Sequence, residues 1–194
     1  MPNIAFLSTA HTHTKGFLKA VSERDDANLV AIWDDMEPRG QGFSEEYGGD
    51  YSNNLDAVIS RDDVDGFIVC AENSRHLPLL EAAIPTGKPI FCEKPLALSL
   101  GEVERAGELC WDQGSKLAVN LFRQFDPSHR EVASLVQEGD LGRIQSVHCY
   151  YGKGLLHNGS HWLDLLRYLF GEVSWVVGKP TGWAFEDDPT CDVH

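Results

Sequence analysis

A glutamate, a lysine and a proline follow directly on a short apolar run, and these residues are well suited to chemistry. Residues 90–92 (Ile-Phe-Cys) read as a buried strand, which Lys94-Pro95 ends because proline has no N–H to continue a ladder. Open α/β sheets bind their ligands at the carboxyl ends of their strands. Glu93 and Lys94 are therefore expected to be functional residues. The alternative is a solvated charge pair in a surface turn.

A second group of reactive side chains lies near the other end of the chain. Ser160 is expected to cap a helix over 161–170, which places His161 in its first turn and Asp164 on the same face. A carboxylate beside an imidazole fixes its tautomer and raises its basicity, as a proton acceptor requires. His157 is expected to reach the same cleft. Two alternatives remain: a structural His–Asp pair, and a zinc site that is disfavoured because the glutamate of H-E-x-x-H is missing.

Residues 8–13 (Ser-Thr-Ala-His-Thr-His) stand where a dinucleotide-binding fold carries G-x-G-x-x-G, with glycine at none of the three positions. Ala10 is small enough for the backbone to approach a pyrophosphate, and the helix that follows offers amides and a positive dipole end. Ser8, Ala10, His11 and His13 are therefore candidate cofactor-binding residues. The alternative for the two histidines is an exposed capping role. No metal site is expected, because neither a cysteine nor a carboxylate neighbours them in sequence.

Asp34 ends the second expected strand, where a carboxylate hydrogen-bonds an adenosine ribose 2′-hydroxyl. A carboxylate there repels the 2′-phosphate of NADP, so NAD is the expected cofactor and NADP is disfavoured. Asp35 could serve instead. An acidic pair at a strand end is also a common turn signal.

The elements that position these residues alternate between strands and helices. Strands are expected at 3–7, 29–33, 66–70, 90–92 and 116–120, and helices at about 15–22, 55–59, 77–84 and 99–111. Ser99 and Glu102 form a capping box for the last of these helices. Residues 36–51, glycine-rich and acidic, are expected to be loop with some helix. Alternating elements with continuous apolar strands predict a parallel sheet covered on both faces.

The pattern changes after Asn120. Helices are expected at 127–138 and 161–170, and strands at 144–151, 174–177 and 183–185. Residues 189–194 resemble the start of a strand that does not finish, so we expect a partial protein that contains one domain and part of a second.

The composition excludes several classes of protein. A net charge of −14 repels phosphate backbones and anionic lipid, which argues against nucleic-acid and membrane partners. No apolar run approaches the roughly 18 residues of a membrane span, and no signal peptide is visible. The five scattered cysteines predict reduced thiols in a cytoplasm, without a disulfide framework or a thiolate zinc site.

Together these residues resemble the Gfo/Idh/MocA family of NAD(P)-dependent oxidoreductases, the relatives of glucose–fructose oxidoreductase and inositol dehydrogenase. The stretches that carry the resemblance are 73–76, 87–97, 120–127, 138–144, 159–161 and 171–173. The resemblance implies a Rossmann-type, doubly wound parallel α/β sheet over residues 1–121. The start of an α+β domain with an open, mostly antiparallel sheet follows over 122–194. In a complete second domain that sheet builds the interface of a homo-oligomer.

The resemblance also assigns roles to residues. Glu93 and Lys94 lie beside the nicotinamide ribose and the substrate, with a cis Lys94–Pro95 peptide; Asn73, His76 and Arg123 line the cofactor cleft; His161 is the proton acceptor, and His157 stands where several relatives carry an aspartate. The implied reaction moves a hydride between nicotinamide and a secondary alcohol or ketone of a sugar, polyol or sugar derivative. The alternative is a non-catalytic dinucleotide-binding regulatory or interaction protein of the same fold.

Overall fold

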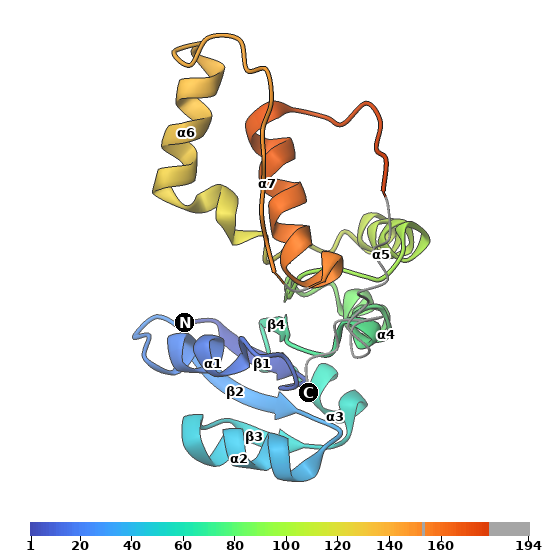
Figure 1. Cartoon of the computed structure of the whole chain (residues 1–194). Coiled ribbons are helices and arrows are strands. Elements are labelled where there is room, and N and C mark those ends of the chain that lie inside the picture. The colour runs from blue at the N-terminus through green and yellow to red at the C-terminus, as the bar shows by residue number, and fades with distance from the viewer. Residues whose placement is uncertain (153, 179–194) are drawn as a thin grey trace. The chain divides into compact units, whose positions relative to one another are not determined.

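The computed structural model of the chain describes residues 1–152 and 154–178, and these fall into two compact units (Figure 1). The first unit is Met1–Asn120 and the second begins at Leu121. Within the described residues, no helix is long and apolar enough to cross a membrane.

The first unit is built on a six-stranded parallel sheet. Its strands are β1 (Asn3–Leu7), β2 (Asn28–Trp33), β3 (Asp50–Ser52), β4 (Gly66–Val69), β5 (Ile90–Cys92) and β6 (Leu117–Val119). Their order across the sheet is β3-β2-β1-β4-β5-β6, with every neighbouring pair parallel. This is the strand order of the doubly wound Rossmann fold, so the predicted fold class is confirmed.

Helices cover both faces of this sheet. They are α1 (Thr14–Ser22), α2 (Glu37–Tyr47), α3 (Leu55–Ile59), α4 (His76–Ala83) and α5 (Leu100–Gln113), with short 3₁₀ turns at Asn73–Arg75 and Ile84–Thr86. Alternate residues along β1 face opposite layers: Phe6 packs with Leu18 of α1, whereas Leu7 belongs to the cluster that holds Leu80 of α4 and Ala106 of α5. Two buried apolar layers therefore fix the sheet between its helices.

Residues 36–51, expected to be loop with some helix, do contain a helix, but the expected loop is wrong because most of the segment forms α2 and β3. The glycines that suggested a loop have a packing role here. A Cβ on Gly40 would lie 2.5 Å from Tyr51 Cε2 and 2.6 Å from the Cβ of Asp34. The missing side chain lets α2 approach β3 and the end of β2 closely, and this benefit outweighs glycine's poor helix propensity.

The predicted helix start at Ser99 is confirmed, although half of its capping box is arranged differently. The Glu102 N–H donates to Ser99 Oγ at 3.3 Å. The Glu102 carboxylate accepts from the N–H of Leu98 at 2.8 Å, one residue before the position that a capping box specifies.

The second unit is helical in its described part. It contains a 3₁₀ turn at Phe122–Phe125, α6 (Pro127–Gln137), a π-helical turn at Leu155–Gly159 and α7 (Ser160–Phe170). The strands expected at 144–151 and 174–177 are not formed. A strand needs a hydrogen-bonded neighbour, and the described residues of this unit contain no other strand to pair with. The expected strands at 183–185 and 189–194 lie outside the described residues.

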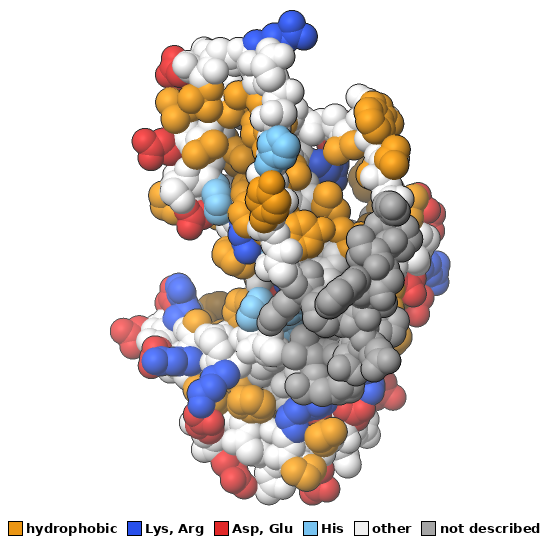
Figure 2. All heavy atoms as spheres, viewed as in Figure 1, with side chains coloured by type: hydrophobic (Ala, Val, Ile, Leu, Met, Phe, Trp, Pro, Cys, Tyr) orange, Lys and Arg blue, Asp and Glu red, His pale blue; other side chains and the backbone are white. Residues whose placement is uncertain are grey.

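Large hydrophobic side chains of the second unit remain exposed (Figure 2). Trp175, Val176 and Val177 retain 77%, 85% and 82% of their accessible surface, and Phe125 retains 67%. Exposed apolar side chains of this size are candidates for an interaction surface.

Candidate functional site

The candidate site begins where the strand order reverses, between β1 and β4. These strands pair in register from Ile4–Gly66 to Leu7–Val69, so they end at the same level. The His11 N–H then donates to the carbonyl of Cys70 at 2.9 Å and fastens the loop after β1 to the end of β4. That loop therefore lies at the topological switch point, where open α/β sheets bind ligands.

Ser8 takes over the backbone role of the first missing glycine. Its φ is +68°, which makes it the sole non-glycine residue with positive φ in the described chain. The N–H of Ala10 donates to Ser8 Oγ at 3.3 Å, and Ser8 is 1% exposed. A left-handed conformation costs an L-residue about 1–2 kcal/mol, which the surrounding contacts offset. The tight turn of a dinucleotide loop is thus kept without glycine.

Asp34 is fully buried at the end of β2, and its carboxylate is saturated with hydrogen bonds. The Thr9 N–H donates to Oδ2 at 2.7 Å and the Thr9 hydroxyl donates to the same oxygen. The Met36 N–H donates to Oδ1 at 2.8 Å, and the Arg39 guanidinium donates at 2.8 to 3.1 Å. Burial opposes ionisation, but the hydrogen bonds from Arg39 and Thr9 outweigh it and lower the Asp34 pKa. Asp34 therefore ties the loop after β1 to the start of α2.

Asp35 is the more accessible carboxylate at this strand end, since 42% of its side chain is exposed. It pairs with Arg75 and lies 3.4 Å from Arg39 Nη2. This carboxylate, flanked by two arginines, is accessible to a ligand from solvent. Sequence reasoning named both aspartates but missed Arg39, five residues beyond Asp34 in the first turn of the following helix.

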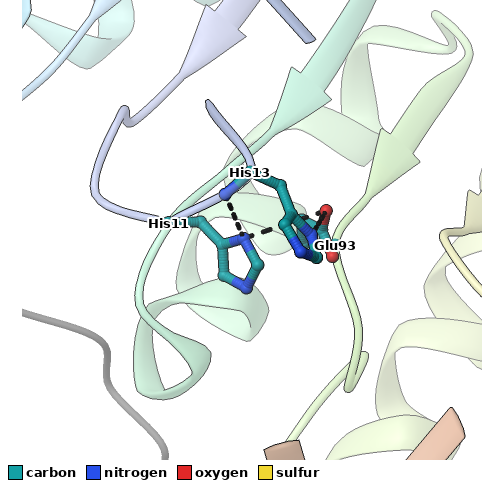
Figure 3. Close-up of side chains that lie close together, drawn as sticks. All are labelled: His11, His13 and Glu93. Atoms are coloured by element: carbon teal, nitrogen blue, oxygen red, sulfur yellow. Dashed lines mark hydrogen bonds and ion pairs between the residues drawn. The ribbon is translucent and has the colours of Figure 1, made fainter. Parts of the chain in front are cut away.

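Glu93 at the end of β5 gathers residues from distant parts of the chain (Figure 3). His13 Nδ1 lies 2.8 Å from Glu93 Oε1 and His11 Nδ1 lies 3.8 Å from it. The Asn120 Nδ2 group donates to Oε1 at 2.9 Å, and the Lys94 N–H donates to Oε2 at 3.0 Å. We call His11, His13 and Glu93 the Glu93 cluster. Asn120 was not identified from the sequence, although its position after the last strand of a parallel sheet could have indicated it.

The ionisation of the Glu93 cluster follows from this geometry. Burial opposes ionisation of Glu93, but the His13 hydrogen bond and the charge of His11 prevail and lower its pKa to about 2. Burial lowers the His11 pKa to about 4. His13 Nδ1 carries a proton, because a carboxylate can only accept. His11 Nδ1 accepts from the N–H of His13 at 3.2 Å, so that nitrogen is unprotonated. His11 is 4% exposed, which excludes the exposed capping role as its alternative.

His76 contacts the turn after β5 through a ring nitrogen. Its two ring nitrogens lie 2.8 Å from the Pro95 carbonyl and 3.2 Å from the Ala71 carbonyl, and the residue is fully buried. His76 thus joins the end of β4 to the Lys94–Pro95 turn, whose peptide is cis as the resemblance implied. Lys94 is 2% exposed and Asn73, which follows β4, is 3% exposed.

The remaining candidate residues belong to the second unit. His161 is 5% exposed in the first turn of α7, with the Phe122 ring edge-on at 5.1 Å. The Arg123 guanidinium stacks over Trp162 at 4.6 Å. Asp164 Oδ1 accepts from Gln124 Nε2 at 2.8 Å. The segment 122–124 therefore packs along α7.

The expected cap at the start of α7 is wrong. Gly159 occupies the cap position, and the Ser160 hydroxyl instead donates back to the carbonyls of Leu156 and His157 at 3.1 and 3.0 Å. The preceding π-helical turn leads directly into α7 and leaves no break for a capping side chain. His157 lies in that turn and is half-buried.

The structure thus gathers most predicted residues at strand ends of one sheet. In the first unit these are Ser8, Ala10, His11, His13, Asp34, Asn73, His76, Glu93 and Lys94, whereas Arg123, His157 and His161 belong to the second unit. A loop at the switch point, an acidic pair after β2 and a lysine after β5 can together hold a dinucleotide and a small polar substrate.

Known proteins resemble this chain in sequence and structure. Residues 9–121 match the model of the GFO_IDH_MocA family, described as an oxidoreductase family with an NAD-binding Rossmann fold. An inositol 2-dehydrogenase of Rhizobium meliloti (strain 1021) is 33% identical over 168 residues, covering 79% of this chain and 51% of that protein. A 2,7-anhydro-N-acetylneuraminate hydratase of Mediterraneibacter gnavus is 26% identical, covering 88% of this chain and 51% of that protein.

A solved structure is also similar to this chain in its fold. The 3-ketoreductase KijD10 from Actinomadura kijaniata, in complex with TDP-benzene and NADP, superposes with a TM-score of 0.76 at 25% identity, covering 88% of this chain and 56% of that one. The chain spans about half the length of the curated relatives it matches. Because the family model covers more than half of the chain and the strand order agrees, this chain belongs to the GFO_IDH_MocA oxidoreductase family and has its NAD-binding Rossmann fold.

Proposed function

We propose that this chain binds NAD along the carboxyl edge of its sheet, as the dinucleotide-binding part of an oxidoreductase. The enzyme would move a hydride between nicotinamide and a secondary alcohol or ketone of a sugar, polyol or sugar derivative. The observation that carries this proposal is the buried Lys94 beside the buried Glu93 at the end of β5. An ammonium is costly to bury, and a protein that only bound dinucleotide would have no need of it there.

The residues present fit a dinucleotide. Ser8 supplies the tight turn through its positive φ, and Ala10 leaves room beside the backbone. The N-terminus of α1 carries no side-chain cap, so the positive end of its dipole is available to a pyrophosphate. Asp35 offers an exposed carboxylate to the ribose, while Asp34 fixes the loop. We therefore assign ribose recognition to Asp35.

Lys94 and His161 supply the acid–base chemistry in this proposal. Bound NAD would accept or donate the hydride. Oxidation of a secondary alcohol also removes a proton from its oxygen. Lys94, hydrogen-bonded to that oxygen, would stabilise the developing alkoxide, and His161 would receive the proton. His157 is proposed as a second polar group on the substrate side. These roles rest on the resemblance and on the burial of both residues.

We also propose a substrate class, a cellular location and a mode of assembly. By their names, two of the relatives described above act on an inositol and on 2,7-anhydro-N-acetylneuraminate, which supports a polyhydroxylated substrate. In the described residues the four cysteines are free thiols, which supports a cytoplasmic location. Self-association is proposed for a chain that carries the complete second domain, because burying the exposed apolar side chains after α7 against another copy would remove them from water.

The first test is a titration of the purified chain with NADH, with NADPH in parallel, followed by nicotinamide fluorescence and energy transfer from tryptophan. Saturable NADH binding is expected, with weaker NADPH binding. Asp35→Ala should weaken NADH binding by about tenfold, which corresponds to one charge-assisted hydrogen bond. Asp25→Ala is the matched control. Asp25 is exposed in the turn before β2, at the amino ends of the strands, so this variant should bind NADH as the parent does.

Two outcomes would contradict the proposal. One is the absence of saturable binding by either dinucleotide, and the other is an equal loss of affinity in both aspartate variants. A chain that binds NADH is next assayed for turnover with polyols and sugars. Loss of turnover in Lys94→Ala and His161→Ala supports the enzyme, and NADH binding without turnover on any such substrate supports the regulatory alternative.

A further inference from the structure

The Glu93 cluster brings two imidazoles and a carboxylate to one point (Figure 3). One ligand atom from each of His11, His13 and Glu93 lies within 4.8 Å of the other two. The two histidine Nδ1 atoms lie 2.8 and 3.8 Å from the same oxygen, Glu93 Oε1. Ligand atoms of a tetrahedral zinc ion lie about 3.3 Å apart, given metal–ligand bonds of about 2.0–2.1 Å. The observed separations bracket this value, so small side-chain rotations would complete a ligand set.

We propose that His11, His13 and Glu93 bind a divalent transition-metal ion of the Zn²⁺ class, as three protein ligands with an open fourth position. Metal ligands must be unprotonated. His11 Nδ1 already is, because it accepts the N–H of His13, and the ion would replace this hydrogen bond at the same lone pair. Glu93 supplies a carboxylate, which is ordinarily ionised at neutral pH. When the ion binds Nδ1 of His13, the proton on that nitrogen moves to Nε2, so the imidazole stays neutral and binds through an unprotonated nitrogen.

Supporting hydrogen bonds hold the carboxylate in place, as they do around metal sites. Asn120 Nδ2 donates to Glu93 Oε1 and the Lys94 N–H donates to Oε2, so both oxygens are oriented. The side chains of Glu93 and His11 are 0% and 2% exposed, whereas 42% of His13 is exposed. The two buried ligands are preorganised, and the half-exposed His13 leaves a path from solvent.

The donor set selects the class of ion. Two imidazole nitrogens suit Zn²⁺, Co²⁺, Ni²⁺ or Cu²⁺, whereas Mg²⁺ and Ca²⁺ require mainly oxygen ligands. A set of two histidines and one carboxylate also leaves a coordination position for water, as in open zinc sites. The sequence argument against metal depended on the absence of a nearby carboxylate, and the fold supplies one from a residue 80 positions away.

The experiment is equilibrium dialysis of the untagged chain against Zn²⁺ alone, with Co²⁺ as a spectroscopic probe. We expect one Zn²⁺ per chain, a tetrahedral Co²⁺ absorption spectrum, and no binding of Mg²⁺ at the same concentration. No dinucleotide is added, so this inference stands or falls independently of the proposed function.

Variants separate this site from others in the chain. His13→Gln and Glu93→Gln should each lower Zn²⁺ affinity by at least about tenfold and remove the Co²⁺ spectrum. His148→Gln, at an exposed histidine of the second unit, should bind as the parent does. Since Glu93 is buried, circular dichroism must show that its variant is folded, and the half-exposed His13 gives the test if it is not. Failure to bind Zn²⁺, or unchanged binding in folded His13→Gln, would overturn the proposal.

Discussion

Replacement of Asp34 by alanine tests whether this residue has a structural role at the end of β2. Its carboxylate accepts hydrogen bonds from the Thr9 N–H and hydroxyl, the Met36 N–H and the Arg39 guanidinium, and it is 0% exposed. Breaking a buried ion pair by removing one partner costs about 3–5 kcal/mol. The Arg39 side chain is 21% exposed and can regain water, so the lower end of that range applies. We expect a loss of about 3 kcal/mol in the free energy of unfolding.

Urea denaturation followed by circular dichroism measures this loss. With a slope of about 2 kcal/mol/M, the midpoint should fall by about 1.5 M. Asp26→Ala is the control, because Asp26 forms an ion pair with Arg24 in which both side chains are largely exposed, and its midpoint should not move measurably.

The effect should also depend on pH. The folded-state pKa of Asp34 is lowered, so its contribution is present above the unfolded pKa of about 3.9 and is lost as pH falls through the folded value. The difference between parent and Asp34→Ala should therefore be constant at neutral pH and shrink below about pH 4. A midpoint shift worth less than about 1 kcal/mol, or a difference that does not change with acid, would refute this account of Asp34.

Three further predictions concern the same strand ends. Asp35→Asn removes the negative charge between two arginines, so the NADPH:NADH affinity ratio should rise about tenfold in parallel fluorescence titrations; an unchanged ratio would contradict the assignment of Asp35. Ser8→Val should lower stability by about 2 kcal/mol and Ser8→Gly should be nearly neutral in urea melts, because φ is +68° there; equal effects would show that backbone strain is not the cause. Gly40→Ala should cost about 2 kcal/mol through the clash with Tyr51, whereas Gly42→Ala in the same helix, where a Cβ meets nothing within 4 Å, should stabilise by about 0.5–1 kcal/mol in the same assay.

Acid should also destabilise the folded state through the Glu93 cluster, and in the same sense for its histidine and its glutamate. Burial holds His11 neutral with a pKa of about 4, so the folded state resists protonation there, and Glu93 stays ionised down to about pH 2. Both folded-state pKa values are lowered, so both groups favour the folded state above their unfolded pKa values and lose that contribution as pH falls.

Apart from α2 and β3, the sequence by itself determined the order of elements in the first unit and most of the residues at the strand ends. The run at 90–92 forms β5, and Ser99 caps α5. These features depend on residues a few positions apart: apolar periodicity, the missing N–H of proline and the hydroxyl of a capping serine. Short-range physical effects of this kind can be inferred without the tertiary structure.

Interactions between distant residues were decided only by the tertiary structure. Glu93 meets His13 across 80 positions, and Asp34 meets Thr9 across 25, because the strand order places those strand ends together. Gly40 lies in a helix, at a position where Tyr51 leaves no room for a Cβ. An alternating pattern at 144–151 does not make a strand without a neighbour. Sequence patterns indicate which residues prefer burial, whereas the register of the sheet decides which polar groups satisfy one another, and this depends on the whole fold.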